Sequence, residues 1–245
     1  MLYFFLAPLF LFFDVTENVD DALALTFAAR RLMWLLASLI LALTYCLGKY
    51  WRDWRIGLTA AILLANTIMF LQKSLDIRPD LISVTCWVGS LVLLVRGIQA
   101  DIVDGRRTRY FLVASGLLLG MAIMAAQKML FAGMGLAVTM SWYLLDSRSH
   151  GSFKTRYTNI LLYLTGLSLP VLLVFGYFAV RGGLGDFIYF NLILNVGWNI
   201  RFSPVASLQR LFAQNRFIVG LSIIGVLSTG LRMFDYSRFR RGILF

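Results

Sequence analysis

The residues of this chain that could bind a charged ligand are most concentrated in the turn from Asp76 to Asp80. This turn reads Asp-Ile-Arg-Pro-Asp and places three charges and a proline within five residues. The guanidinium of Arg78 could meet an anionic ligand, and the carboxylates could hold a hydroxyl, a metal ion or Arg78 itself. Two uncharged apolar runs, 56–72 and 81–95, flank the turn. In a membrane protein, charges so placed need water or a polar ligand, which makes the turn a candidate binding site.

The same turn also has a purely structural explanation. Pro79 has no backbone N–H and therefore suits the first turn of the helix that follows. Asp80 would be favoured in that first turn by the helix dipole. A well-formed helix start accounts for these two residues without any ligand, so the sequence leaves both explanations open.

Lys128 is a second candidate. It follows Gln127 between two apolar runs. Its ammonium could bind a lipid phosphate, on the same face of the membrane as Arg78 and Arg201. It could equally extend its aliphatic stem along apolar surface and fix the turn without binding anything.

The segment 182–216 carries the remaining candidates. Asn191, Asn195 and Arg201 lie there among aromatic residues. Carboxamides and aromatic faces are what sugar recognition uses, whereas an interfacial aromatic belt explains the aromatic residues without a ligand. The segment is too polar to span a membrane, and we expect one or two short interfacial helices in it, the second starting at Pro204.

Composition bounds the class of protein. The chain has 245 residues, is 60% hydrophobic and only 14% charged, and has a mean hydropathy of +0.78. These values predict an integral membrane protein. The net charge is +11, and the basic residues cluster at the ends of apolar runs, which indicates contact with lipid headgroups and a role in membrane topology rather than nucleic-acid binding.

The cysteines and the histidine suggest no special chemistry. Cys46 and Cys86 lie inside apolar runs and imply no disulfide. The single His150 argues against a histidine-based metal site or triad.

Uncharged apolar runs predict an all-α, polytopic bundle of about seven transmembrane helices with short interfacial helices. The predicted spans are 32–48, 56–72, 81–95, 110–126, 129–145, 158–180 and 217–231. One helix from Tyr110 to Leu145 would be about 54 Å long, against a hydrocarbon core of about 30 Å. We therefore predict a helical hairpin with Lys128 at its turn.

The distribution of basic residues predicts the orientation. If alternate connections share a side, one side receives fourteen Lys and Arg residues and the other nine. The richer side is then cytoplasmic, which places Asp76–Asp80, Lys128 and the segment 182–216 on the external face. We expect one transmembrane domain, 1–245, whose parts are an interfacial helix and loop (1–21), six spans (22–181), an external loop (182–216), and a last span with a basic tail (217–245).

Other sequence signals are weak. Gly116 and Gly120 form a small-xxx-small pair that could let two helices approach closely, although ordinary glycines in a membrane helix would look the same. No phosphate-binding glycine loop, zinc motif or serine-nucleophile motif is present, so no metal site is predicted; the cofactors stay unknown, and a divalent metal is possible without being indicated. Charged residues in the middle of a span are also absent, which counts against a transporter.

Five stretches, in order along the chain, resemble membrane-embedded glycosyltransferases of the GT-C superfamily. The resemblance is closest to the bacterial and archaeal branch related to protein O-mannosyltransferases and aminoarabinose transferases, of the family 39 type. The stretches that carry it are Leu2–Phe10, Ala28–Leu32, Asp76–Asp80, Gly116–Lys128 and Phe190–Pro204. The resemblance covers most of the chain and rests on the order of these stretches and on their shared external side.

This resemblance implies transfer of a sugar from a polyprenyl-phosphate carrier to an unknown acceptor at the external face of a bacterial or archaeal inner membrane. It implies membrane lipid and the sugar-lipid donor as partners, and no nucleic acid. Arg78, Lys128 and Arg201 would contact the carrier phosphate, whose departure basic side chains assist. Asp76 and Asp80 would position Arg78 or the sugar.

This chain also differs from the family that it resembles in one respect. The family's catalytic acidic residue lies upstream of the stretch that Leu2–Phe10 resembles, so the base is not assigned. The acidic residues Asp14, Glu17, Asp20 and Asp21 come too late to inherit its role. We therefore expect a partial enzyme, truncated at both ends. The alternative is a non-enzymatic multispan protein, such as a subunit of a lipid-linked sugar flippase or a small transporter.

Overall fold

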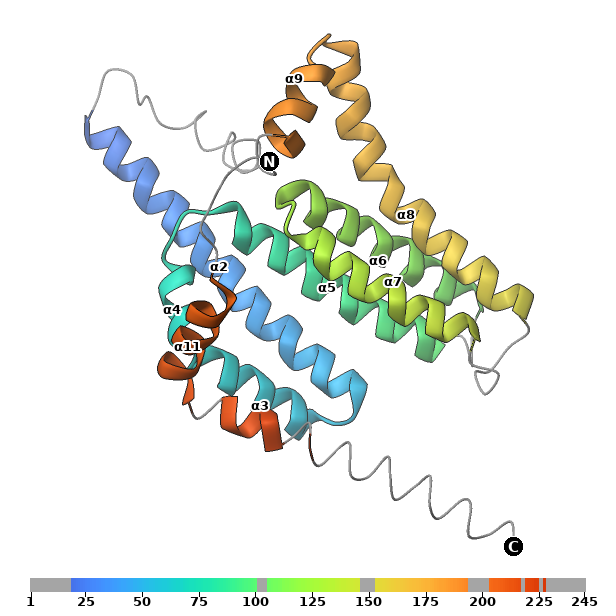
Figure 1. Cartoon of the computed structure of the whole chain (residues 1–245), viewed down its shortest axis with the longest axis horizontal. Helices are drawn as coiled ribbons and strands as arrows, with labels where there is room; N and C mark the ends of the chain where they lie inside the picture. The colour runs from blue at the N-terminus through green and yellow to red at the C-terminus, as the bar shows by residue number, and fades with distance from the viewer. Residues whose placement is uncertain are drawn as a thin grey trace, which may run out of the picture.

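The computed structural model describes residues 19–100, 105–145, 153–193, 203–216, 219–224 and 227 (Figure 1). Within these residues the chain is helical and has no strand, which confirms the predicted all-α class. The predicted interfacial helix near the N-terminus lies outside the described residues, as do Asn195 and Arg201. The helices are α2 (Val19–Trp51), α3 (Trp54–Ala65), α4 (Ile68–Ser74), α5 (Pro79–Ala100), α6 (Gly105–Ala125), α7 (Met129–Leu145), α8 (Phe153–Val180), α9 (Leu184–Ile188), the π-helical turn η2 (Tyr189–Ile193) and α11 (Pro204–Gln214).

Four described helices, α2, α5, α6 and α8, are long and apolar enough to cross a membrane. The bent pair α3–α4 would make a fifth span within the described part of the chain. Helix α7, of 17 residues, covers the predicted span 129–145, and most of the predicted span 217–231 lies outside the described residues. The protein is thus a multi-pass membrane helix bundle in which four to five candidate spans are described, where the sequence predicts about seven over the whole chain.

The run 56–72, predicted as one span, is broken into α3 and α4, which meet at 70°. Two polar residues stand at the break. The side-chain amide of Asn66 donates to the carbonyl of Ile62 at 2.8 Å, and the hydroxyl of Thr67 donates to the carbonyl of Leu63 at 3.1 Å. Side chains that bond to nearby backbone groups compete with the continuing helix, which explains why the helix ends here.

Two helix starts agree with the sequence. Helix α5 begins at Pro79 and has Asp80 in its first turn. Helix α11 begins at Pro204, and the hydroxyl of Ser203 accepts a hydrogen bond from the backbone N–H of Ala206 at 3.2 Å. A proline lacks the N–H that the first turn of a helix leaves unsatisfied, and a serine before it supplies an acceptor for another. Both predicted starts are confirmed.

Glycines set the closest helix packing. A Cβ at Gly116 would collide with the carbonyl oxygen of Tyr163 on α8, and a Cβ at Gly120 would collide with that of Leu167. In return, a Cβ at Gly166 of α8 would collide with the carbonyl of Val113 on α6. The close helix approach that the small-xxx-small pair suggested is therefore present, because the backbones of α6 and α8 touch with no side chain between them.

A buried polar contact joins α5 to α6 inside the same core. Ser90 and Ser115 are both fully buried, with 0% exposure. Their hydroxyl oxygens lie 3.1 Å apart, and the hydroxyl of Ser115 also donates to the carbonyl of Ser90 at 2.7 Å. The same helices contribute to one cluster of buried apolar side chains, namely Leu94, Leu112, Leu119, Ala122, Ile123, Met129, Leu136 and Tyr163. Helices α5, α6 and α8 therefore form the packed centre of the bundle.

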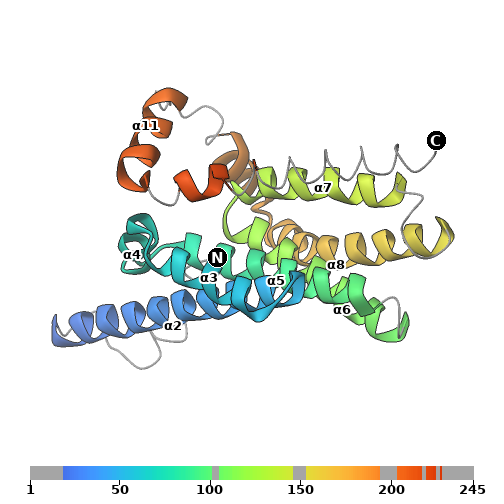
Figure 2. The same ribbon diagram turned by 90° about the horizontal axis from the view of Figure 1, so that it is seen from below.

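The remaining helices flank this centre. Figure 2 shows α2 along one side of the bundle and α7 along the opposite side. In Figure 1 the connections α4–α5, α6–α7 and α8–α9 all lie at the upper end, and α5 and α6 meet at the lower end. We call the upper end, which carries Asp76, Lys128 and Gly182, the turn end. Asp76, Lys128 and Gly182, which the sequence predicts for one face of the membrane, thus lie at one end of the molecule.

Candidate functional site

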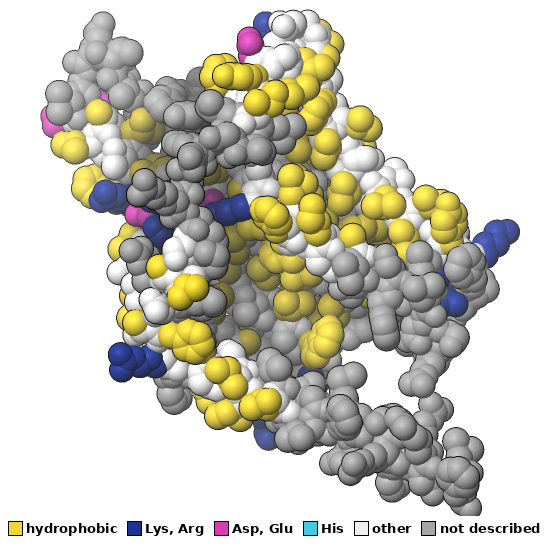
Figure 3. Space-filling view, viewed as in Figure 1, with side chains coloured by type: hydrophobic (Ala, Val, Ile, Leu, Met, Phe, Trp, Pro, Cys, Tyr) yellow, Lys and Arg dark blue, Asp and Glu magenta, His cyan; other side chains and the backbone are white. Residues whose placement is uncertain are grey.

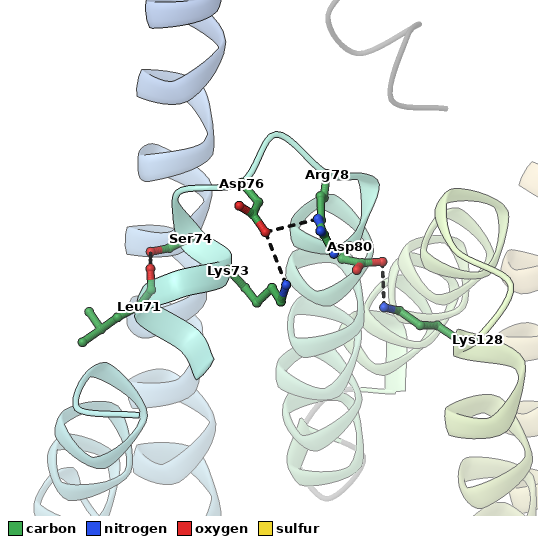
Figure 4. Close-up of polar contacts among 7 residues, drawn as sticks. All are labelled: Leu71, Lys73, Ser74, Asp76, Arg78, Asp80 and Lys128. Atoms are coloured by element: carbon green, nitrogen blue, oxygen red, sulfur yellow. Dashed lines mark hydrogen bonds and ion pairs between the residues drawn. The ribbon is translucent and has the colours of Figure 1, made fainter. Parts of the chain in front are cut away.

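At the turn end, Asp76 pairs with two cations. Its Oδ2 lies 3.3 Å from Nζ of Lys73 and 3.2 Å from Nε of Arg78 (Figure 4). Lys73 comes from the last turn of α4, and Arg78 precedes the first residue of α5. Of the roles left open for the carboxylates, Asp76 therefore takes that of holding Arg78. Lys73 was not predicted as part of the site, although its position three residues before Asp76 was a signal for this ion pair.

A third ion pair connects two turns that are distant in sequence. Nζ of Lys128, in the α6–α7 turn, lies 2.7 Å from Oδ1 of Asp80, in the first turn of α5 (Figure 4). The side chains are 58% and 36% exposed, respectively. Helix α6 ends at Ala125 and α7 begins at Met129, so the predicted hairpin break at Lys128 is present. The sequence placed both residues on one face and did not predict that they touch.

These ion pairs add little to stability. Exposed pairs between Lys or Arg and a carboxylate contribute about 0–1 kcal/mol, because water already solvates both partners and holding them costs side-chain entropy. Five charged side chains that hold one another so weakly can exchange partners at low cost. The cluster of Lys73, Asp76, Arg78, Asp80 and Lys128, here called the charged cluster, is therefore suited to meeting an ionic ligand.

An apolar groove begins one residue from Lys128. Gln127 lines it, together with side chains of α6, α7, α8 and α9, and its volume is about 710 Å³. The lining is mostly apolar, with Met124, Leu130 and Val174 typical of it. The two carboxamides in the lining are those of Gln127 and Asn191. A groove of this size and lining is typical of a binding site for an apolar molecule with a few polar groups.

The outer wall of the groove is built by a reversal of the chain after α8. Gly182 has φ +69°, a backbone conformation that side chains disfavour. Its N–H donates to the carbonyl of Ala179 at 3.1 Å, and the N–H of Gly183 donates to that of Phe178 at 2.9 Å. This is a Schellman motif, which ends α8 and turns the chain back. The ring of Phe187 in α9 then stacks on Phe178 at 4.5 Å between ring centroids.

Asn191 lies on this reversed segment. It belongs to η2, and its side-chain amide donates to the carbonyl of Phe187 at 2.9 Å. The hydrogen bond fixes the carboxamide in the lining of the groove, and its predicted role in sugar recognition stays a prediction. Asn195 and Arg201, predicted for the same site, lie outside the described residues, so their predicted roles stay predictions.

The surface combines apolar and charged regions at the turn end. Figure 3 shows hydrophobic side chains along α8 and α9, with charged side chains of both signs near the start of α5. Large apolar side chains such as Leu172 and Leu173 are about two thirds exposed, as expected of a surface that faces lipid. Within the described part of the chain, no group of three His, Cys, Asp or Glu residues could hold a metal ion.

Comparison with known proteins gives one match. The model of the family described as dolichyl-phosphate-mannose-protein mannosyltransferase matches residues 9–178, which is more than half of the chain. The matched part includes Asp76, Arg78, Asp80 and Lys128, and ends before Asn191. None of the curated proteins and none of the solved structures that were compared matches the chain.

Proposed function

The chain belongs to the dolichyl-phosphate-mannose-protein mannosyltransferase family and is thus a membrane glycosyltransferase of the GT-C type; from this premise we propose that it handles a sugar carried on a polyprenyl phosphate. The sugar would pass to an acceptor at the external face of a bacterial or archaeal cell membrane. The positive-inside count supports that face, because it puts the turn end outside.

One observation carries the proposal. The Lys128–Asp80 contact of 2.7 Å brings the α4–α5 and α6–α7 turns together, and Gln127, the residue before Lys128, lines the apolar groove. A polyprenyl-phosphate sugar has an apolar chain, an anionic phosphate and a hydroxyl-rich head in that order. The apolar groove could take the chain, the ammonium of Lys128 the phosphate, and the carboxamides of Gln127 and Asn191 the hydroxyl groups.

The predicted site residues other than Asp80 then have the following proposed roles. Lys128 and Arg78 contact the carrier phosphate, and Arg201 joins them from the later segment. Asp76 positions Arg78, to which it is paired at 3.2 Å. Asn191 and Asn195 bind sugar hydroxyls. Cations aimed at the phosphate stabilise the negative charge that grows there as the sugar leaves.

We assign no catalytic base among the described residues. Asp20 and Asp21 lie in the first turn of α2, where the helix dipole already accounts for acidic side chains. The proposed role of the charged cluster is therefore to bind the donor and to stabilise its leaving group. We assign no residue of the cluster to activation of the acceptor.

The test is replacement of Lys128 by Met, which keeps the length of the stem and removes the charge. In membranes that contain the protein, transfer of labelled sugar from a polyprenyl-phosphate donor should fall by about 100-fold, the usual scale for loss of one charge-stabilising donor. Lys154→Met, an exposed lysine in the first turn of α8 at the opposite end, is the matched control and should leave transfer unchanged.

Two other outcomes are informative. Transfer at the wild-type rate in Lys128→Met would remove Lys128 from the phosphate site. Binding of the donor by the wild-type protein, with movement of the lipid across the bilayer and no sugar transfer to any acceptor, would favour the non-enzymatic alternative of a flippase subunit or transporter.

A further inference from the structure

The ammonium of Lys128 already has an anionic partner. The carboxylate of Asp80 lies 2.7 Å from it, so a phosphate that approaches Lys128 must compete with Asp80. Figure 4 shows the two side chains meeting between the start of α5 and the α6–α7 turn. Whichever anion Lys128 binds, Asp80 remains close by and repels it.

We propose that Asp80 is a specificity-determining residue that favours the singly charged sugar donor over the more highly charged carrier phosphate left after transfer. Asp80 would thereby speed release of the spent carrier. This inference rests on the proposed function, because it takes a polyprenyl-phosphate sugar as the donor. It assigns Asp80 a role beyond positioning Arg78 or the sugar.

The charge balance of the reaction gives the physical reason. During transfer, the bond between the anomeric carbon and the phosphate oxygen breaks, and its electron pair stays on the phosphate. The acceptor hydroxyl loses its proton to a base and its oxygen bonds to the anomeric carbon. The donor, a phosphodiester, carries one negative charge, whereas the released phosphomonoester carries about 1.5 to 2 at neutral pH. Repulsion from a fixed carboxylate is therefore larger for the product.

The structure indicates that Asp80 stays in place when Lys128 turns to a ligand. Asp80 lies in the first turn of α5, where the positive end of the helix dipole stabilises its charge. Lys128 lies in a short turn on a flexible stem and is 58% exposed. Its ammonium can therefore swing from carboxylate to phosphate while Asp80 remains near the phosphate.

Asp76 does not offer the same discrimination. Among the ion pairs of the described residues, Asp76 has two cationic partners, Lys73 and Arg78, whereas Asp80 has one. Two cations face the single negative charge of Asp76, so a phosphate near Arg78 meets a surplus of one positive charge. Discrimination between one and two negative charges is thus expected at Asp80.

The test measures binding of two lipids to the full chain in nanodiscs: a polyprenyl monophosphate and its methyl ester, which has the single charge of the donor. Asp80→Asn should tighten binding of the monophosphate by about two- to fivefold, the range expected for one exposed ion pair. It should tighten binding of the methyl ester less, so the ratio of the two affinities should shift. Asp186→Asn, an exposed carboxylate in α9 at the same end, is the control and should leave the ratio unchanged.

The outcomes separate the two proposals. If Asp80→Asn weakens binding of both lipids, Asp80 holds Lys128 in position and the inference is wrong, although Lys128 remains a phosphate ligand. Equal tightening of both lipids also overturns the inference, because no discrimination is then lost. If Lys128→Met leaves binding of both lipids unchanged, the phosphate site itself is misplaced and the proposed function loses its support.

Discussion

The centre of the bundle and its turn end follow opposite physical rules. In the centre, α6 and α8 touch backbone to backbone at Gly116 and Gly166, and the hydroxyls of Ser90 and Ser115 are fully buried. At the turn end, the charged cluster is one third or more exposed, and an open groove of about 710 Å³ lies beside it. The first region has no room for change, and the second has room for a ligand.

The difference separates positioning from binding. Close-packed backbone contacts have few alternative arrangements and hold α5, α6 and α8 at fixed distances. Exposed ion pairs are weak and can rearrange when a ligand arrives. The α4–α5 and α6–α7 turns are anchored on these rigid helices. The charged side chains of the turns can therefore change ion-pair partners while the turns themselves stay in position. Substitutions in the two regions should therefore have different consequences, and three experiments test this.

The largest effect is expected at Gly116. In Gly116→Leu, the new side chain would meet the carbonyl of Tyr163 and force α6 away from α8. Overpacking of this kind costs about 1–3 kcal/mol or more, so the variant should lose several degrees of thermal stability in detergent or fail to accumulate. Gly176→Leu in α8, where a Cβ meets nothing within 4 Å, is the control and should melt close to wild type. Equal stability of the two variants would show that the α6–α8 contact is not tight.

A smaller effect is expected from the buried hydroxyls. In Ser115→Ala, the bonds to the carbonyl and hydroxyl of Ser90 are lost and both groups stay buried. The expected loss of unfolding free energy is about 1 kcal/mol, in the range found for hydrogen bonds between membrane helices. Ser168→Ala removes an exposed bond within α8 and should cost less. Unfolding of both variants in denaturing detergent would give the comparison, and a neutral Ser115→Ala would contradict it.

The smallest effect on stability is expected at Lys128. Loss of its exposed ion pair with Asp80 in Lys128→Met should change the unfolding free energy by less than about 1 kcal/mol. The same variant should bind the phosphate lipid much more weakly. A variant that is stable but does not bind would set the turn end apart from the centre. A large loss of stability in Lys128→Met would instead make the pair a structural lock.

Local signals in the sequence were sufficient for several elements. Pro79 and Pro204 mark helix starts because proline fits the first helical turn, and both starts are as predicted. Gln127 and Lys128 interrupt a run that is too long for one membrane crossing, and the chain turns there. These predictions depend only on neighbouring residues and on the thickness of a bilayer. They could therefore be made from the sequence without knowledge of the tertiary structure.

The site could be predicted only in part. The common face of Asp80 and Lys128 followed from topology, but their contact depends on how α5 packs against α6 and α7, which no local pattern encodes. The groove depends on α9 folding back on α8, also a tertiary event. The break at Asn66 was not predicted for another reason. A run of seventeen uncharged residues predicts one span, but the side chains of Asn66 and Thr67 bond to the backbone and end the helix within that run.

The Schellman turn at Gly182 has a consequence for how this protein could diversify. Glycine is the one achiral amino acid, and any other residue would pay about 1–2 kcal/mol to adopt a φ of +69°. A single codon change there would therefore loosen the reversal that holds α9 against the apolar groove. The width of the groove, and with it the length or saturation of the carrier proposed to bind there, could then change through a residue that does not line the groove.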